Sequence, residues 1–218
     1  MSVNDRTTTT EVAPTAPALA VADPAPLGLA GFALTTFLLS AANAGWMTHA
    51  TGNSWLGYAF AYGGFGQLLA GMWEFRNRNV FGATAFSTYG GFWLGFGAFV
   101  VLAETTGFLA SYKPNDLANA GAWFLVAFAI FNTYMLIASL RNSVAVFLVF
   151  LTLEITEILL AIGNFNSAHT NGHHLWWVHA GGWAGVVTAA FAWYASAAGV
   201  MNGQAGRRVW PVGAALMR

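Results

Sequence analysis

The stretch SVAVFLVFLTLEITEILLAIG, residues 143–163, is long and apolar enough to cross a lipid bilayer as a single helix. Windows of about 20 residues with a similar apolar character recur along the rest of the chain. We therefore predict an all-α, multi-pass membrane protein whose six transmembrane helices form a compact bundle. The predicted helices cover residues 27–47, 55–75, 84–104, 119–140, 143–163 and 175–200.

The composition of the whole chain agrees with a membrane location. Only 7% of the residues are charged and 57% are hydrophobic, whereas soluble domains carry about 25% charged residues. The formal net charge is zero, so no basic surface favours nucleic acid as a partner. Cysteine is absent, which excludes disulfides, thiolate metal sites and thiol catalysis.

Three segments divide the chain. Residues 1–22 are rich in Thr, Ala and Pro without an apolar period, and they are predicted to be a disordered N-terminal tail. Asp5 and Glu11 with a single Arg6 do not fit a signal peptide, so the first apolar segment is expected to remain as a helix. Residues 23–213 form the predicted six-helix domain, and residues 214–218 form a C-terminal tail.

The basic residues predict the orientation. If both termini lie on one side of the membrane, every arginine shares that side and Lys113 alone lies on the other. Because Lys and Arg are retained on the cytoplasmic side, both termini are expected to be cytoplasmic, in a cytoplasmic (inner) membrane. The arginines are Arg6, Arg76, Arg78, Arg141, Arg207, Arg208 and Arg218.

Glycine occurs 25 times, mostly inside the predicted helices. Gly91 with Gly95, and Gly181 with Gly185, have the spacing that lets two helix backbones approach closely. We interpret these glycines as packing residues. The alternative is that glycines line a narrow pore.

The segment that precedes the first predicted helix carries two prolines, Pro24 and Pro26, after Asp23. Proline does not fit a helix interior but suits a first turn, and an Asp before it can cap the free amides. The helix should therefore begin here. The alternative interpretation is irregular backbone, including Ala25, that lines an aqueous cavity where the positive helix end attracts an anion.

A second polar segment, residues 74–90, follows the second predicted helix. Asn79 is a candidate N-cap, and the hydroxyls of Thr84, Ser87 and Thr88 share one helix face. Such hydroxyls often bond only to carbonyls four residues back. They would also suit a path for a carboxylate, which needs donors without a fixed countercharge that would trap it.

Together these segments resemble the acetate uptake transporter family, whose signature Asn-Pro-Ala-Pro-Leu-Gly-Leu is matched by residues 24–29, with Asp23 in place of the Asn. The resemblance covers residues 23–213. Further matches are WEF at residues 73–75, NVFGATAF at 79–86, YG at 89–90, FW at 92–93, LAIGN at 160–164, and AG at 180–181 with Gly185.

This resemblance implies a homohexamer of six-helix protomers, each a compact bundle like those of aquaporins and urea channels. Each protomer is expected to have its own pore for acetate and, in some members, succinate. It implies a pore narrowed by Phe32, Tyr89 and Leu153, where an apolar ring can gate by dewetting and the phenol can offer one hydrogen bond. The expected partners are small carboxylates, membrane lipid and other copies of the chain, with no cofactor or metal. Asn43, Gln67, Glu74 and Thr84 also occupy polar positions that match the family.

Three acids depart from what the resemblance explains. Asp23 would repel an anion unless it is protonated or paired. Glu154 and Glu157 lie in the middle of a predicted transmembrane helix, three residues apart and thus on similar faces. Acids inside a membrane are functional candidates by default, and we expect one or both to be protonated and to face the pore or a neighbouring protomer. Their role is either a proton relay or a neutral hydrogen bond between helices, so an anion channel and a proton-coupled symporter both stay open.

Other functions have less support in the sequence. His169, His173, His174 and His179 lack a nearby acid or Cys, so we expect hydrated loop histidines and a hydrogen-bonded His179 rather than a metal site. Lys113 lies in a loop, which excludes a retinal Schiff base within a helix. No serine has an obvious catalytic partner, so an enzyme is not expected. A channel for small neutral solutes such as urea or ammonia remains the alternative.

Overall fold

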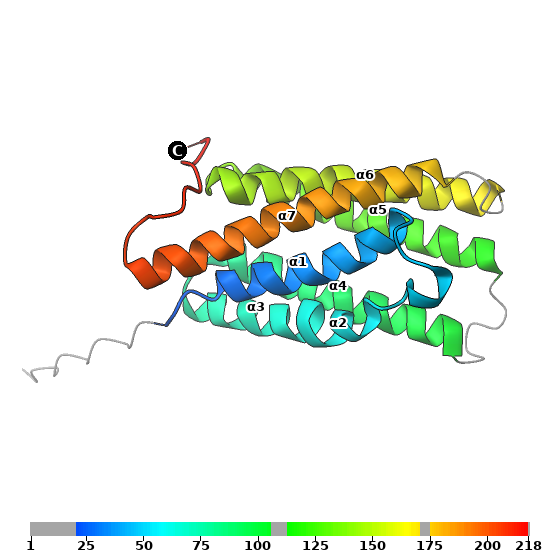
Figure 1. Ribbon diagram of the computed structural model, residues 1–218, viewed down its shortest axis with the longest axis horizontal. Helices are drawn as coiled ribbons and strands as arrows, with labels where there is room; N and C mark the ends of the chain where they lie inside the picture. The colour runs from blue at the N-terminus through cyan, green and yellow to red at the C-terminus, as the bar shows by residue number, and fades with distance from the viewer. Residues whose placement is uncertain (1–20, 106–112, 171–174, 218) are drawn as a thin grey trace, which may run out of the picture.

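Long helices run side by side along one axis in the computed structural model, which describes residues 21–105, 113–170 and 175–217 (Figure 1). Most of the predicted N-terminal tail, together with His173 and His174, lies outside the described residues. The elements are α1 (Ala25–Asn43), η1 (His49–Thr51), α2 (Leu56–Phe60), η2 (Ala61–Gly66), α3 (Gln67–Arg76), α4 (Val80–Thr105), α5 (Pro114–Ser139), α6 (Val144–Thr170) and α7 (Trp176–Ala205).

Within these described residues, five helices are long and apolar enough to cross a membrane: α1, α4, α5, α6 and α7. The span predicted at residues 55–75 forms three shorter segments that follow one another without a gap, α2, the π-helical η2 and α3. Gly63 and Gly64 are buried in η2. A Cβ at Gly64 would lie 2.3 Å from the carbonyl oxygen of Ala59, so the widened turn depends on a residue without a side chain.

Polar side chains set the starts of α1 and α4. The Asp23 carboxylate accepts a hydrogen bond from the Ala25 amide at 2.9 Å, and Pro24 is the N-cap residue of α1. Asn79 Oδ1 accepts one from the Gly82 amide at 3.1 Å. Because this cap precedes Val80, α4 begins four residues before the predicted position.

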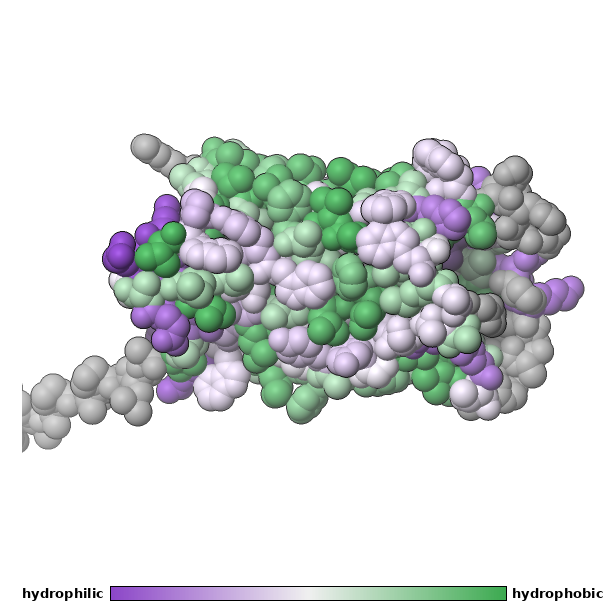
Figure 2. Space-filling view, viewed as in Figure 1, coloured by the Kyte–Doolittle hydropathy of each residue, from purple (hydrophilic) through white to green (hydrophobic). Residues whose placement is uncertain are grey.

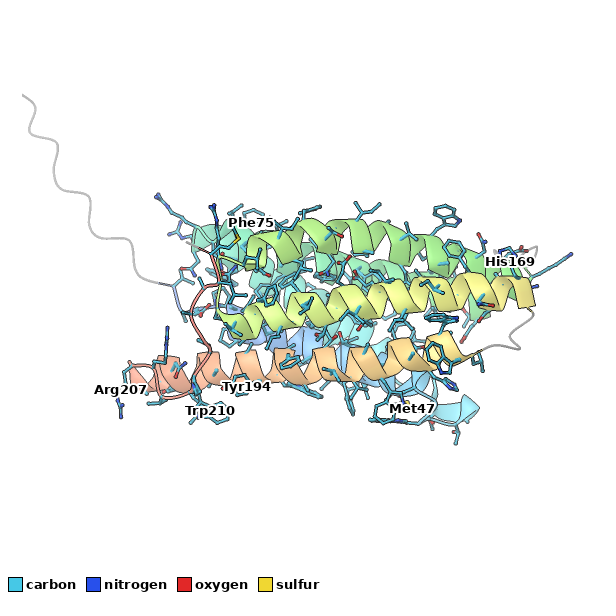
Figure 3. The ribbon with its side chains drawn as sticks, turned by 90° about the horizontal axis from the view of Figure 1, so that it is seen from above. Met47, Phe75, His169, Tyr194, Arg207 and Trp210 are labelled. Carbon is cyan, nitrogen blue, oxygen red and sulfur yellow. The ribbon has the colours of Figure 1, made fainter. Side chains whose placement is uncertain are left out.

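Basic residues mark one end of the bundle. Arg76 ends α3, Arg141 lies between α5 and α6, and Arg207 follows α7, so all three lie at what we call the arginine end. Figure 3 shows Arg207 and Phe75 at this end, and Met47 with His169 at the other. Lys113 precedes α5 at that opposite end, the lysine end. Hydrophilic side chains gather at both ends, and apolar ones cover most of the sides between them (Figure 2).

Glycines of α7 let this helix pack closely on its neighbours. A Cβ on Gly182 would lie 2.3 Å from the backbone nitrogen of Ala44 at the end of α1, and one on Gly185 would meet Ser40. Gly181 faces Leu160 of α6. This glycine motif is therefore used for helix packing.

Gly91 and Gly95 of α4 behave differently. A Cβ on either residue would meet no atom within 4 Å. Both line a lateral cleft between α4 and α5, two helices that contact each other little. The other residues of this lateral cleft are Thr88, Phe92, Phe96, Phe124 and Phe128.

The C-terminal segment folds back onto the arginine end. Asn202 Oδ1 accepts hydrogen bonds from the amides of Val209 and Trp210, at 2.7 and 2.8 Å. Beyond them, the Val212 carbonyl accepts a bond from the Ala145 amide of α6, and the Leu216 amide donates to the Leu140 carbonyl. The predicted tail at residues 214–218 is thus held against the connection between α5 and α6 as far as it is described.

Candidate functional site

Three cavities follow one another along the bundle axis. We name them the arginine-end cavity, which Gln67 and Glu74 line, the waist cavity, which Thr36 and Glu157 line, and the lysine-end cavity, which Glu104 and Asn164 line. The arginine-end cavity and the waist cavity share three lining residues, Phe32, Tyr89 and Leu153. The waist cavity in turn shares residues with the lysine-end cavity, among them Asn43 and Leu160. The volumes of the cavities are about 110, 50 and 290 Å³ in this order, so the smallest lies in the middle.

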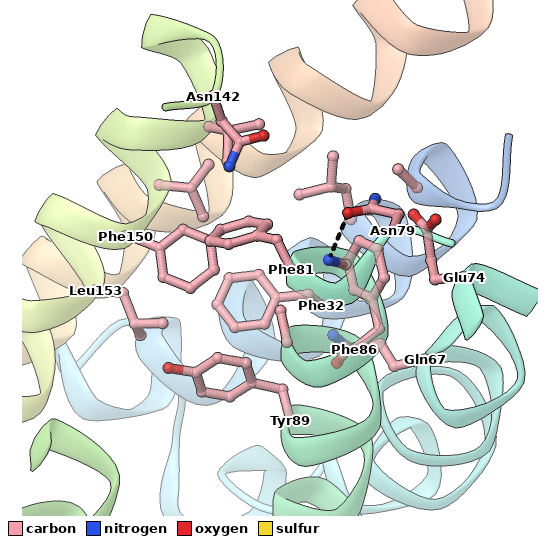
Figure 4. A pocket seen from close by; sticks show the side chains of 16 residues that line it. Phe32, Gln67, Glu74, Asn79, Phe81, Phe86, Tyr89, Asn142, Phe150 and Leu153 are labelled. Carbon is pink, nitrogen blue, oxygen red and sulfur yellow. Dashed lines mark hydrogen bonds between the residues drawn. The ribbon is translucent and has the colours of Figure 1, made fainter. Parts of the chain in front are cut away.

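The arginine-end cavity is lined by α1, α3, α4 and α6 (Figure 4). Gln67 and Glu74 of α3 are almost fully buried beside it. Gln67 Oε1 and Glu74 Oε1 have no hydrogen-bond partner within the described residues, although Asn77 reaches the other Glu74 oxygen at 3.4 Å. Buried polar atoms need a partner, so these two oxygens give the apolar wall two points that can bind water or a polar solute.

The boundary between the arginine-end cavity and the waist is made by Phe32 of α1, Tyr89 of α4 and Leu153 of α6. Their side chains point toward one another in Figure 4, and they are only 5%, 4% and 6% exposed. The rings of Phe32 and Tyr89 meet edge to face, with centroids 5.6 Å apart. These are the three residues that the sequence predicted as a constriction, and they border both cavities.

The Tyr89 hydroxyl is the polar group of this boundary, and it donates a hydrogen bond of 2.9 Å to Asn132 Oδ1 of α5. Asn132 is fully buried, and its Nδ2 donates to the Phe150 carbonyl at 3.0 Å and to Glu154 Oε2 at 2.7 Å. Because the Phe150 carbonyl can only accept, the amide nitrogen must face it, which leaves Oδ1 for Tyr89. The Tyr89 proton is therefore already engaged.

Glu154 and Glu157 have different surroundings, although they lie three residues apart on α6. The Glu154 carboxyl is directed to α5, where Asn132 and the Thr133 hydroxyl lie 2.7 and 2.9 Å from its two oxygens. Glu157 is 5% exposed, lines the waist cavity and lies near the Tyr89 hydroxyl. Its Oε2 has no hydrogen-bond partner in the described part of the protein.

Hydroxyl and amide groups surround the rest of the waist cavity. Thr36 and Ser40 of α1 line it, and the Thr36 hydroxyl is buried without a partner in the described residues. The Thr156 hydroxyl lies 2.8 Å from the Thr152 carbonyl of its own helix, to which it can donate. Asn43 lies where the waist cavity meets the lysine-end cavity.

The lysine-end cavity combines aromatic walls with three polar groups, Asn43, Glu104 and Asn164. Asn53 Nδ2 lies 2.8 and 3.0 Å from the two oxygens of Glu104. Asn164 instead donates to the Leu160 carbonyl one turn earlier in α6. Glu104 is exposed, so this acid stands at the mouth of the cavity.

The remaining predicted site residues lie in different places. Ala25 and Asn79 line the arginine-end cavity, while Asp23 and Pro24 lie just before it at the start of α1. Thr88 instead lines the lateral cleft. Thr84 borders none of the three axial cavities. Around it in α4, residues 81, 82, 85, 86 and 89 face the arginine-end cavity.

Sequence reasoning missed several residues of this site. Asn132 is the most informative of them, since it joins Tyr89 to Glu154. An amide in the middle of an apolar helix was a signal of the same kind as the two acids. Asn142 and Phe150 of the arginine-end cavity, and Thr36 of the waist, carried no comparable signal.

His169 and His179 are not among the lining residues of these cavities. His169 is near the end of α6 and His179 is an exposed residue of α7. Across the described ranges, no group of three His, Cys, Asp or Glu side chains could hold a metal ion.

Comparisons with known proteins find relatives that are named as transport proteins. The chain is 42% identical over 188 residues to acetate permease A of Emericella nidulans, covering 83% of this chain and 62% of that protein. It is 40% identical over 191 residues to ammonia transport outward protein 2 of Saccharomyces cerevisiae, covering 87% of this chain and 65% of that protein. The chain thus spans less than two thirds of the length of these fungal relatives.

Bacterial relatives match over nearly their full length. The succinate-acetate/proton symporter SatP of Escherichia coli K12 is 35% identical over 195 residues, covering 88% of this chain and 96% of that protein. A solved structure of the bacterial acetate channel SatP superposes with a TM-score of 0.78 at 34% identity, covering 89% of this chain and all of that one. The pattern of one family matches residues 6–213, and the chain belongs to this GPR1/FUN34/yaaH family of multi-pass membrane proteins.

Proposed function

We propose that this protein transports acetate and related small carboxylates, succinate among them, across the cytoplasmic membrane through the three axial cavities. The observation that carries the proposal is the boundary of Phe32, Tyr89 and Leu153, which is common to two cavities and almost fully buried. The relatives named acetate permease and succinate-acetate/proton symporter support the choice of solute.

The chemistry of the path suits a small, partly apolar anion. Its walls are mostly aliphatic and aromatic, with neutral polar groups such as Gln67, Asn43 and Thr36 between them. Three acids also line the cavities, Glu74, Glu104 and Glu157. Among the described residues, no Lys or Arg lines the three cavities. A carboxylate that meets neutral donors in turn is held weakly enough to leave again.

We further propose that each protomer crosses the membrane six times, with α2, η2 and α3 together as the second crossing. Residues 56–76 are helical throughout, and at 1.5 Å per residue such a run is about as long as a bilayer core is thick. With six crossings, both termini lie on the same side of the membrane, at the arginine end, which we assign to the cytoplasm. Lys113 follows the third crossing and therefore lies on the opposite side. The homohexamer implied by the sequence stays a prediction.

The orientation has a direct test because the chain has no cysteine. Single cysteines at Ser143 and at Lys113 mark the arginine end and the lysine end. In intact cells, a membrane-impermeant maleimide is expected to label only the Lys113→Cys variant. Labelling of Ser143→Cys alone would reverse the assignment.

A neutral-solute channel is the second candidate, favoured by the relative named ammonia transport outward protein 2. An apolar waist of about 50 Å³ would also admit ammonia. Proteoliposomes distinguish the two functions when uptake of labelled acetate, urea and methylammonium is compared with uptake by protein-free vesicles. We expect acetate uptake to exceed that of the other two.

A matched pair of variants assigns that uptake to the axial path. Leu153→Trp fills the waist boundary, whereas Ile158→Trp places the same side chain on the lipid-facing surface of α6, where Ile158 is 44% exposed. Leu153→Trp is expected to abolish acetate uptake and Ile158→Trp to preserve it. Equal uptake by both variants would exclude the axial path.

A further inference from the structure

The waist cavity is lined by a buried acid, Glu157, one of whose carboxyl oxygens has no hydrogen-bond partner in the described residues. Glu157 Oε2 is inaccessible and makes no hydrogen bond within the described residues, and Glu157 lines the cavity beside Thr36. The Thr36 hydroxyl is likewise buried and unpartnered there. Trp93 Nε1 of α4 is also unpartnered in the described residues, and Trp93 lines the same cavity. Three side chains with an unpartnered polar atom, from α1, α4 and α6, therefore border one cavity, where a ligand or water would supply the missing hydrogen bonds.

The size of the waist cavity fits a very small ligand. A water molecule needs about 10–15 Å³ of such volume. The waist cavity of about 50 Å³ therefore has room for several non-hydrogen atoms, as many as a carboxylate group with its methyl.

The hydrogen-bond donors available to an anion in this cavity are few. The Tyr89 hydroxyl donates its hydrogen bond to Asn132, and the Thr156 hydroxyl has the Thr152 carbonyl as its acceptor. The neutral donors that remain are the Thr36 hydroxyl and the Trp93 indole N–H, with Ser40 and Asn43 also in the lining. Glu157 becomes a further donor only when its carboxyl carries a proton. An ionised Glu157 would instead repel the anion across a space with little water to screen the charges.

The described groups around Glu157 supply no positive charge that would stabilise its ionised form. Glu154 lies one turn away on α6, Tyr89 faces Glu157 from α4, and Tyr134 of α5 is close enough to act electrostatically on Tyr89. From α1, the waist cavity is lined by Thr36, Ser40 and Asn43, and the α7 residue Thr188 lies at hydrogen-bond distance from Thr156. No Lys, Arg or His among the described residues lines the waist cavity to neutralise an ionised Glu157.

We infer that Glu157 is the proton-binding residue of the waist, and that a carboxylate passes it only together with one proton. The Glu157 carboxyl takes up a proton from one side, donates a hydrogen bond to the anion beside Thr36, and releases the proton to the other side after the anion leaves. One proton and one singly charged anion cross, so the net charge moved is zero. This inference rests on the proposed carboxylate transport and assigns its coupling to one side chain.

Glu154 interacts with α5 and not with the waist cavity. Its carboxyl is turned to α5, where it fixes Asn132 and through it the Tyr89 hydroxyl. Glu154 is therefore a positioning residue. Glu154→Gln and Glu157→Gln form a matched pair, since each removes one acid from the same helix without changing the side-chain size.

The test uses the full chain in proteoliposomes, with initial rates of labelled acetate uptake measured above those of protein-free vesicles. A proton gradient and a valinomycin-set potassium potential are imposed separately. The wild-type protein is expected to respond to an acidic exterior and to ignore the potential. Glu154→Gln is expected to keep this pattern of responses even where the rate of uptake falls, since Glu154 positions Asn132. Glu157→Gln should still carry acetate, lose the response to the proton gradient and gain a response to the potential.

Several results would overturn the assignment. The first is a Glu157→Gln variant whose acetate uptake still responds to the proton gradient. The second is wild-type uptake that responds only to the membrane potential, and the third is wild-type uptake that responds to a Na⁺ gradient and not to a proton gradient. Absence of wild-type acetate uptake would instead refute the proposed function itself. If Glu157→Gln does not fold, Glu157→Asp keeps the acid, and uptake by it that is independent of the proton gradient would equally overturn the assignment.

Discussion

The hydroxyl of Tyr89 donates a hydrogen bond of 2.9 Å to the side-chain oxygen of Asn132, and this bond links α4 to α5 at the boundary between the arginine-end cavity and the waist cavity. The two helices otherwise contact each other little, because the lateral cleft separates them. The bond therefore couples the shape of the waist to the position of α5. It also determines which groups remain free to bind a passing solute.

This bond should be visible as coupling between two substitutions. Tyr89→Phe and Asn132→Leu each leave buried groups without partners, whereas the double variant removes both ends of the same bond. We expect the double variant to be more stable than the sum of the single effects predicts, by about 0.6–1.7 kcal/mol. Unfolding in detergent measures this difference. Tyr194→Phe, which removes a remote hydroxyl, should be additive with Asn132→Leu, and additivity of Tyr89→Phe as well would contradict the link.

The waist boundary should also control solute size. Leu153→Ala removes three carbon atoms from the wall shared by two cavities, so a longer dicarboxylate gains more than acetate does. We expect the ratio of succinate to acetate uptake to rise severalfold in proteoliposomes. Ile158→Ala on the lipid-facing side of the same helix should leave the ratio unchanged. An equal change of the succinate-to-acetate ratio in both variants would show that the waist boundary does not determine solute size.

The close approach of α1 and α7 predicts a large effect from one methyl group. In Gly182→Ala the new Cβ would lie 2.3 Å from the backbone nitrogen of Ala44, so α1 must shift. Overpacking of this kind costs about 1–3 kcal/mol, and the midpoint of thermal unfolding in detergent should fall. Gly203→Ala on the same helix meets nothing within 4 Å and should not lower the midpoint. A fall of equal size in both variants would indicate a helix effect rather than a contact.

The folded-back C-terminal segment depends on Asn202, which makes three hydrogen bonds to the backbone of Val209 and Trp210. If each bond contributes about 1 kcal/mol, Asn202→Ala should raise the open fraction of this segment at least about tenfold. Limited trypsin digestion after Arg207 and Arg208 reports that opening. Gln204→Ala, an exposed neighbour, serves as the control. Cleavage at the wild-type rate in Asn202→Ala would show that other contacts hold the segment.

Sequence reasoning predicted the long helices well because their apolar windows are unambiguous, and it placed the ends of α5 and α7 within a few residues. It missed the interruption at η2. A π turn preserves the apolar character of a helix, and only the pair Gly63 and Gly64 hinted at it. Glycine pairs also looked alike, although Gly181 and Gly185 pack against neighbours while Gly91 and Gly95 face an open cleft. That difference depends on where other helices lie, which spacing does not encode.

The residues of the candidate site were likewise predicted only in part. Phe32, Tyr89 and Leu153 came from a family resemblance, since nothing local distinguishes one aromatic or aliphatic residue of such helices from another. Glu154 and Glu157 were found from charge alone, but their separate surroundings were not. Three residues along a helix turn the side chain by about 60°, which is enough to direct one acid to α5 and the other to the waist. The hydroxyl of Thr88 was misleading for the same reason, since it lies on the face of α4 that borders the lateral cleft.

The most direct test of the axial path uses a cysteine beside the waist. Ala85 lines the arginine-end cavity and is 3% exposed, so Ala85→Cys is a mild change at a position that solute must pass. Treatment with an anionic methanethiosulfonate should add a charged group there and abolish acetate uptake, and a reducing agent should restore it. The wild type has no cysteine and should be unaffected. Complete modification by mass spectrometry with undiminished acetate uptake would show that the solute crosses elsewhere.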